Sequence, residues 1–164
     1  MSISRFQFLR GDLNGSRVAI RPPWSLDETT FTEYCSRCGD CVKQCPENIL
    51  EQGRGGFPQI NFKGNGCTFC QVCVEVCKEQ VFKQDLTELP WLLNVTIKSN
   101  CVSQHGTVCQ VCAEQCETEA IRYRYVMGGS QIPELTPDLC TGCGYCYGTC
   151  PTNAIEIIQV EGNL

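Results

Sequence analysis

The sequence contains a single histidine, His105, and this scarcity limits the chemistry that its side chains can perform. A Rieske-type iron–sulfur centre needs two histidine ligands, so that class is excluded. The same scarcity gives no basis for a catalytic Cys/His or Ser/His pair. The P-loop, the dinucleotide-binding glycine pattern and the H-E-x-x-H zinc motif are missing as well. We therefore do not expect an enzyme.

Long apolar segments are also absent. No run of about 18 apolar residues occurs, so we expect no membrane-spanning helix. Residues 1–15 lack the apolar region of a secretory signal peptide. A secreted protein held by disulfides is the alternative explanation for a chain rich in cysteine, and it requires such a signal. We therefore expect a cytoplasmic protein with reduced thiols.

Cysteine, in contrast, is abundant. The sixteen cysteines form four tight groups. These are Cys35, Cys38, Cys41, Cys45; Cys67, Cys70, Cys73, Cys77; Cys101, Cys109, Cys112, Cys116; and Cys140, Cys143, Cys146, Cys150. Three groups have the spacing C-x2-C-x2-C-x3-C, with which bacterial ferredoxins bind [4Fe–4S] clusters. Zinc ribbons instead use two C-x-x-C pairs joined by a long spacer. The spacing therefore predicts iron–sulfur clusters rather than zinc.

The third group departs from this spacing. Residues 102–108 separate Cys101 from Cys109, where the other groups have two residues. A loop can absorb this insertion, so we expect a cluster here too. The alternative is that Cys101 is a free thiol and that the site holds three irons or none. His105 lies in the insertion and reads as a surface residue.

In two-cluster ferredoxins the fourth cysteine of each group binds the cluster of the other group. This rule predicts four sites, each made of three cysteines from one group and the fourth from its neighbour. They are set 1 (Cys35, Cys38, Cys41, Cys77), set 2 (Cys67, Cys70, Cys73, Cys45), set 3 (Cys101, Cys109, Cys112, Cys150) and set 4 (Cys140, Cys143, Cys146, Cys116). Such crossed ligation ties distant segments together. It also leaves no iron open to a substrate.

The cysteine groups form an internal repeat that extends into the residues around them. Each fourth cysteine is followed by three residues and then by an apolar pair, which predicts a short helix after the third cysteine that ends near the fourth, and then a strand. Glycines at 53–56 and 128–129 separate strand-like segments and predict hairpins. We therefore expect an α+β fold of two tandem bacterial-type 2[4Fe–4S] ferredoxin-like modules, with small two-stranded sheets and short helices.

The predicted regions are an N-terminal arm at 1–30, a first module at 31–83, an apolar connector at 84–99 and a second module at 100–164. Residues 89–93 of the connector, LPWLL, are expected to pack between the modules, and Asp27, Thr29 or Thr30 to cap a helix. The whole chain has a formal net charge of −5, which argues against nucleic acid as a partner.

The beginning of the arm is locally basic. Residues 1–24 contain four arginines and one aspartate. A basic arm on an acidic body can fold back on it or reach an acidic partner, and a solvated tail is the alternative. We expect removal of residues 1–24 to leave the clusters intact and to weaken partner binding.

Several segments occur together in a known family. They are Arg21-Pro22-Pro23-Trp24-Ser25, the first cysteine group with residues 46–49, the loop Gly55-Gly56-Phe57-Pro58, and Cys67-Thr68-Phe69-Cys70. On these segments the chain resembles the NapF family of ferredoxin-type accessory proteins, encoded with bacterial periplasmic nitrate reductase.

The resemblance implies a cytoplasmic iron–sulfur protein that binds the catalytic molybdenum subunit of that reductase. It implies a role in the maturation of this subunit before export, by electron transfer or by assembly of the subunit's own [4Fe–4S] cluster. A general soluble low-potential electron carrier is the alternative function.

Overall fold

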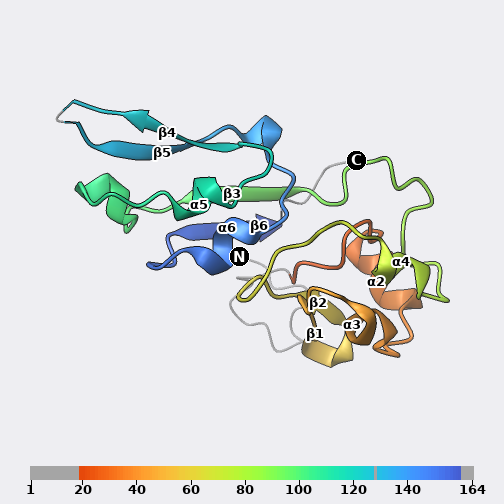
Figure 1. The fold of residues 1–164 in the computed structure, drawn as a ribbon. Helices are drawn as coiled ribbons and strands as arrows, with labels where there is room; N and C mark the ends of the chain where they lie inside the picture. Colours follow the sequence, from red (N-terminus) through yellow and green to blue (C-terminus); the bar gives the residue numbers. More distant parts are fainter. Residues whose placement is uncertain (1–18, 128, 160–164) are drawn as a thin grey trace, which may run out of the picture.

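The computed structural model describes residues 19–127 and 129–159. They form a first half (19–83) and a second half (93–159), which lie against each other (Figure 1). The first half contains α2 (Glu28–Tyr34), α3 (Asp40–Gln44), β1 (Leu50–Gln52), β2 (Pro58–Ile60) and α4 (Val72–Glu75). The second contains β3 (Leu93–Ile97), α5 (Val111–Glu114), β4 (Ile121–Tyr125), β5 (Gln131–Leu135), α6 (Tyr145–Thr149) and β6 (Ile155–Gln159). The predicted α+β architecture is confirmed.

The strands pair as antiparallel two-stranded sheets. Both predicted hairpins are present, with β1 paired to β2 and β4 paired to β5. The second half is closed by a third sheet, in which its first strand, β3, pairs with its last, β6. The first half is closed in the same way by a single bridge between Ser25 and Phe82. Each half is therefore fastened by its own two ends.

Each cysteine group contains one short helix. α3, α4, α5 and α6 all begin one residue before the third cysteine of their group and end before the fourth. The third cysteine is therefore inside the helix and not, as predicted, in front of it. Gly39 and Gly144 precede α3 and α6 with φ values of 76° and 84°, a left-handed conformation that glycine adopts without steric cost. None of the described helices is long and apolar enough to cross a membrane.

The helix ahead of the first group begins as predicted. Oδ1 of Asp27 accepts hydrogen bonds from the backbone N–H groups of Thr29 and Thr30, at 3.1 and 3.0 Å. These two N–H groups have no partner inside the helix, so the cap stabilises the start of α2. Phe31 on this helix is buried in the first half.

Arg21 is buried in the first half and does not lie on an exposed arm. Its guanidinium forms a two-point ion pair with Glu28, with both N–O distances 2.7 Å, and donates to the carbonyl of Pro58 at 2.9 Å. The rings of Phe31 and Phe57 lie 5.4 and 5.5 Å from its guanidinium carbon. The charge is thus neutralised and enclosed, as a buried arginine requires.

Trp24 is buried with it, at 4% exposure. Its indole Nε1 donates to the carbonyl of Glu88 at 3.1 Å, and its own carbonyl accepts from the N–H of Lys83 at 2.8 Å. Removal of all of residues 1–24 with the clusters intact stays a prediction, and the structure argues against it for the final residues, because Arg21 and Trp24 are buried parts of the first half. Residues 1–18 of the predicted arm lie outside the described residues.

The predicted connector has two different parts. Trp91 packs edge-on against the rings of Phe62 and Phe69, with centroids 5.9 and 5.8 Å apart, and its Nε1 donates to the carbonyl of Thr141 at 3.0 Å. Trp91 therefore lies between the halves as expected. Leu89 and Leu92 do not, because 65% and 48% of their surface is exposed. Residues 93–97 form β3 and belong to the sheet of the second half.

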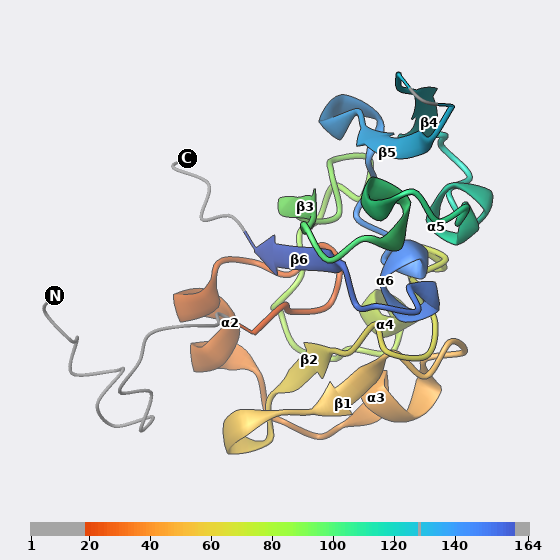
Figure 2. The same cartoon turned by 90° about the vertical axis from the view of Figure 1, so that its left-hand side faces the viewer.

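The two halves share a continuous apolar core. One cluster gathers around Ile49, Leu50 and Phe62, and a second around Val95, Ile121 and Ile155. Tyr147 and Ile157 pack against both clusters. Figure 2 shows α6 above the first half, where the halves meet.

Candidate iron–sulfur sites

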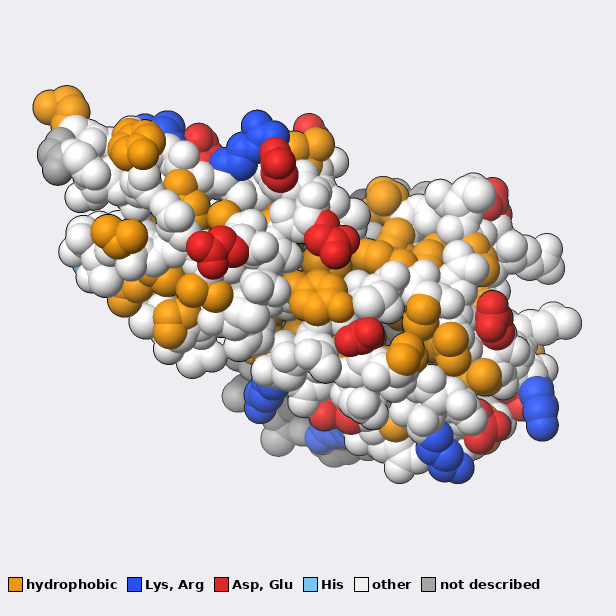
Figure 3. Space-filling view, viewed as in Figure 1, with side chains coloured by type: hydrophobic (Ala, Val, Ile, Leu, Met, Phe, Trp, Pro, Cys, Tyr) orange, Lys and Arg blue, Asp and Glu red, His pale blue; other side chains and the backbone are white. Residues whose placement is uncertain are grey.

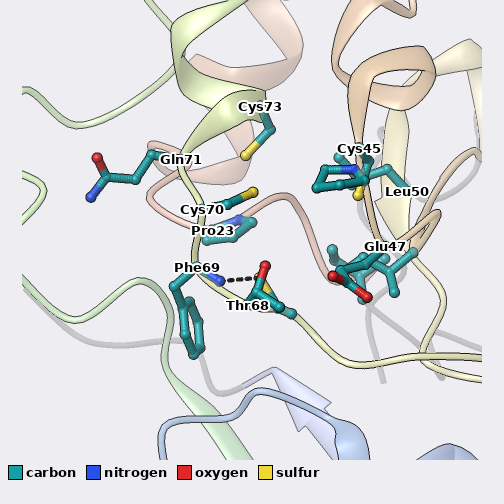
Figure 4. Close-up of a pocket in the computed structure, with 13 residues that line it drawn as sticks. Pro23, Cys45, Glu47, Leu50, Thr68, Phe69, Cys70, Gln71 and Cys73 are labelled. Atoms are coloured by element: carbon teal, nitrogen blue, oxygen red, sulfur yellow. Dashed lines mark hydrogen bonds between the residues drawn. The ribbon is translucent and has the colours of Figure 1, made fainter.

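The cysteines of set 2 line a pocket in the first half (Figure 4). Cys45 follows α3, Cys73 lies on α4, and Cys67 and Cys70 come from the loop before it. The sulfur atoms of Cys45, Cys70 and Cys73 face the same space in Figure 4. Apolar side chains complete the wall: Pro23, Ile49, Leu50 and Ile60. The structure thus brings together the four thiols that the crossed rule groups as set 2.

The cysteines of set 3 line a second pocket, in the second half. Cys101 is among them, together with Cys109, Cys112 and Cys150, so the insertion does not remove Cys101 from the group. The insertion forms a 3₁₀ turn at Val102–His105.

Ser103 fastens this turn to the rest of the group. Ser103 is 1% exposed and its hydroxyl donates to the carbonyl of Cys109 at 2.7 Å. The turn therefore brings Cys101 back beside the other thiols. His105 lies at the surface, with Nε2 2.7 Å from the carbonyl oxygen of Ser99.

Sets 1 and 4 converge in the same manner. Burial raises the pKa of Cys41 to about 11, and the next contributions come from Cys35, Cys77 and Cys38, the other members of set 1. Burial likewise raises the pKa of Cys146 to about 12, followed by Cys143 and Cys140 of set 4, then Cys112 of the neighbouring set 3, then Cys116 of set 4. Cys41 is thus surrounded by the other thiols of set 1, and Cys146 by those of set 4 together with one thiol of set 3.

The loops that carry the thiols repeat one backbone conformation. In three groups the residues before and after the second cysteine have positive φ. They are Arg37 (59°) and Gly39 (76°), Phe69 (55°) and Gln71 (63°), and Gly142 (73°) and Gly144 (84°). A left-handed residue other than glycine costs roughly 1–2 kcal/mol. Such strain recurs at functional sites, where the surrounding structure maintains it.

The donors of these pockets fit an iron–sulfur cluster. The N–H of Phe69 donates to Sγ of Cys67 at 3.4 Å, and the N–H of Ala154 to Sγ of Cys150 at 3.2 Å. Burial raises the pKa of Cys67 and of Cys73 to about 12, so these sulfurs need a bound cation to be thiolates at neutral pH. Among the described residues, no three Cys, His, Asp or Glu side chains are arranged to hold a single metal ion. The four-sulfur pockets have the ligands that a larger cluster requires.

Comparisons with known proteins agree with this donor chemistry. Residues 34–81 match the family described as 4Fe-4S dicluster domain, and residues 133–156 match the 4Fe-4S binding domain. The ferredoxin-type protein NapF of Escherichia coli (strain K12) is 41% identical over 152 residues, which cover 93% of this chain and 92% of that protein. This chain belongs to the NapF family.

Two further relatives support the assignment. The NapF of Haemophilus influenzae is 39% identical over 172 residues, covering 99% of this chain and 97% of that protein. The methylamine utilization ferredoxin-type protein MauM of Methylobacillus flagellatus is 30% identical over 179 residues, covering 98% and 76%. As a NapF-family chain, the protein is a ferredoxin-type protein with [4Fe–4S] clusters and not an enzyme, as the sequence predicted. All four cysteines of the third group lie outside both matched segments.

One residue near the thiols was not anticipated. The hydroxyl of Tyr123 lies 3.4 Å from Sγ of Cys112 in set 3. The sequence instead indicates Tyr145 and Tyr147 as the tyrosines that pack over a cluster, because they flank Cys146. Tyr123 on β4 is brought to Cys112 only by the packing of α5 against that strand. The alternation of the segment IRYRY, which places Tyr123 on the same face as the buried Ile121, is the signal that could have indicated it.

Replacing Tyr123 with Phe should lower the reduction potential of the cluster on set 3. When a cluster is bound, Cys112 is a thiolate, so the tyrosine O–H can only donate, and such a bond favours the more negative reduced state. A difference of about 1 kcal/mol corresponds to roughly 40 mV for one electron. A redox titration followed by EPR measures this shift. Tyr125→Phe, a change on the same strand at a residue that is 73% exposed, is the control and should leave every potential unchanged.

Proposed function

We propose that this protein carries four [4Fe–4S] clusters, one on each predicted set of cysteines. The observation that carries this proposal is the crossed grouping of thiols, seen most directly where Cys45 joins the second group and Cys150 joins the third. Bound clusters supply one-electron transfer. The chain's own residues would hold them by their thiolates, exclude water with apolar walls and donate N–H groups to sulfur.

The partner that we propose is the catalytic molybdenum subunit of periplasmic nitrate reductase, bound in the cytoplasm before its export. The protein would assist the maturation of that subunit, by electron transfer or by assembly of its cluster. Support comes from membership of the NapF family. The resemblance to that family implies a protein encoded with this reductase.

An exposed apolar tip offers a surface for this partner. Tyr125 and Met127 at the end of the β4–β5 hairpin are 73% and 101% exposed, and Val108 on the insertion is 87% exposed. Figure 3 shows hydrophobic side chains protruding at this end of the second half. Tyrosine and methionine are enriched in protein interfaces.

Co-purification with the precursor of the catalytic subunit tests the proposal. We expect a stable one-to-one complex, and at least a tenfold loss of affinity when Tyr125 and Met127 are both replaced by serine. Lys98→Ser, at an exposed position elsewhere on the second half, should bind normally. Absence of any complex with the cluster-loaded protein would favour the alternative, a general soluble low-potential electron carrier.

A further inference from the structure

A direct backbone hydrogen bond joins a thiol-bearing loop of one half to a thiol-bearing loop of the other. The N–H of Cys67 donates to the carbonyl oxygen of Cys143 at 2.7 Å. Cys67 belongs to set 2 in the first half, and Cys143 to set 4 in the second. The main chains of two cysteines from different sets are therefore in contact where the halves meet.

Glycines permit this close approach. A Cβ atom at Gly148, on α6, would lie 2.7 Å from the carbonyl oxygen of Phe62 and 2.9 Å from that of Lys63. A Cβ at Gly144 would overlap the ring of Phe62, and one at Gly66 would overlap the ring of Tyr145. At Gly148 the two backbones thus meet directly, and at Gly144 and Gly66 a ring from the other half packs on the glycine.

Trp91 covers this junction. Its ring packs against Phe69, which lies between two cysteines of set 2. Its Nε1 donates to the carbonyl of Thr141, which lies between two cysteines of set 4. One indole therefore contacts both loops.

Within each half, the sets are neighbours as well. Helix α3, which carries Cys41 of set 1, packs against α4, which carries Cys73 of set 2. Helix α5, which carries Cys112 of set 3, packs against α6, which carries Cys146 of set 4. The spatial order of the sets is therefore 1, 2, 4, 3, which differs from their order in the sequence.

We propose that the four sets form one linear electron path through both halves, joined at the contact between Cys67 and Cys143. This inference rests on the proposed four clusters. With clusters bound, a low-potential one-electron donor would reduce the site at one end, each site would be reoxidised as it passes the electron to the next, and a one-electron acceptor at the other end would take it. No bond is made or broken and no proton is required. Electrons then pass through all four sites of the protein, which does not act as two independent two-cluster ferredoxins.

The path is tested in a variant that keeps only the two sites at the junction. Cys35→Ala with Cys101→Ala removes one ligand from set 1 and one from set 3, leaving about eight irons on sets 2 and 4. After reduction with dithionite, the EPR signals of these two sites should be broadened by their magnetic interaction. Two isolated signals from a protein with about eight irons would overturn the path.

Gly148→Ala is then added to this variant. Its Cβ would meet backbone carbonyls, which cannot turn away as a side chain can, so the backbones of the two halves must shift apart at Gly148. The broadening should decrease, with the iron content unchanged. Gly64→Ala on the neighbouring loop is the matched control, because nothing lies within 4 Å of its Cβ, and the broadening should persist. Equal spectra from the two variants would contradict the proposed junction.

Iron content separates the two proposals. A full-length chain that never holds about sixteen irons contradicts the four clusters and not their order. If the Cys35→Ala, Cys101→Ala variant loses its remaining iron, Gly148→Ala and Gly64→Ala are compared instead in the chain that keeps all sixteen cysteines. There, Gly148→Ala must narrow the broadened spectrum while its iron is retained, and an unchanged spectrum overturns the path.

Discussion

Replacing Cys45 and Cys67 together should remove no more iron than replacing either one alone. Both thiols line the same pocket, so the double variant loses one cluster and retains about twelve of about sixteen irons. Replacing Cys35 and Cys45 together should remove two clusters and leave about eight irons, because these neighbours in sequence belong to different sets. Iron and acid-labile sulfide per chain, measured on anaerobically purified protein, give the answer.

The two double variants control for each other, because each removes two thiols from the first half. Ligation within each sequence group predicts the reverse order of iron contents, so that result would refute the crossed sets. The second half offers the same comparison. Cys101→Ala with Cys150→Ala should leave about twelve irons, and Cys140→Ala with Cys150→Ala about eight. Retention of all iron after Cys101→Ala would show that this thiol is not a ligand.

Trp24→Ala should destabilise the first half by about 3–5 kcal/mol, the usual cost of deleting a buried tryptophan side chain. Trp24 is 4% exposed, packs edge-on against Phe69 at 6.1 Å and donates to the carbonyl of Glu88. Its φ of 59° is also costly, and alanine would keep that strain while losing the contacts. Because Phe69 lies between two cysteines of set 2, weaker retention of that cluster should follow.

Thermal unfolding of the cluster-loaded protein under anaerobic conditions measures this loss. Leu89→Ala is the matched control, since Leu89 follows Glu88 directly yet is 65% exposed. An exposed substitution of this kind usually changes stability by less than about 0.5 kcal/mol. Equal midpoints for the two variants would mean that the segment around Trp24 is an arm after all.

The sequence predicted best what local spacing determines. Three cysteines at three-residue intervals define a loop around one cofactor, and glycines at 53–56 and 128–129 define hairpins, because both patterns depend on residues close in the chain. The apolar pairs after the first, third and fourth groups lead into strands as predicted, whereas Val81-Phe82 after the second group forms only a single bridge. The thiols of set 2 and set 3 lie together as the crossed rule predicts.

What the sequence did not predict depends on distant residues. A segment with Arg21 followed by two prolines is typical of an exposed region of the chain. Arg21 is nevertheless buried, because Glu28 neutralises its charge, the carbonyl of Pro58 accepts a hydrogen bond from it and the ring of Phe57 covers it. The contact of Cys67 with Cys143 joins residues far apart in the chain. It depends on the docking of one half on the other, which no local pattern encodes.

The way in which each half is fastened has a consequence for biosynthesis. The first half closes through Ser25 and Phe82, and Trp24 donates hydrogen bonds to the carbonyls of Glu88 and Pro90, so all of these segments are available once residue 90 has left the ribosome. The second half closes through β3 and β6, and must wait until residues 155–159 have been made. Because domains fold as units and the N-terminal one comes first during synthesis, the first half can receive its iron while the second is still being translated. The folded first half then presents the surface at Phe62 and Gly66 against which α6 packs when the second half folds.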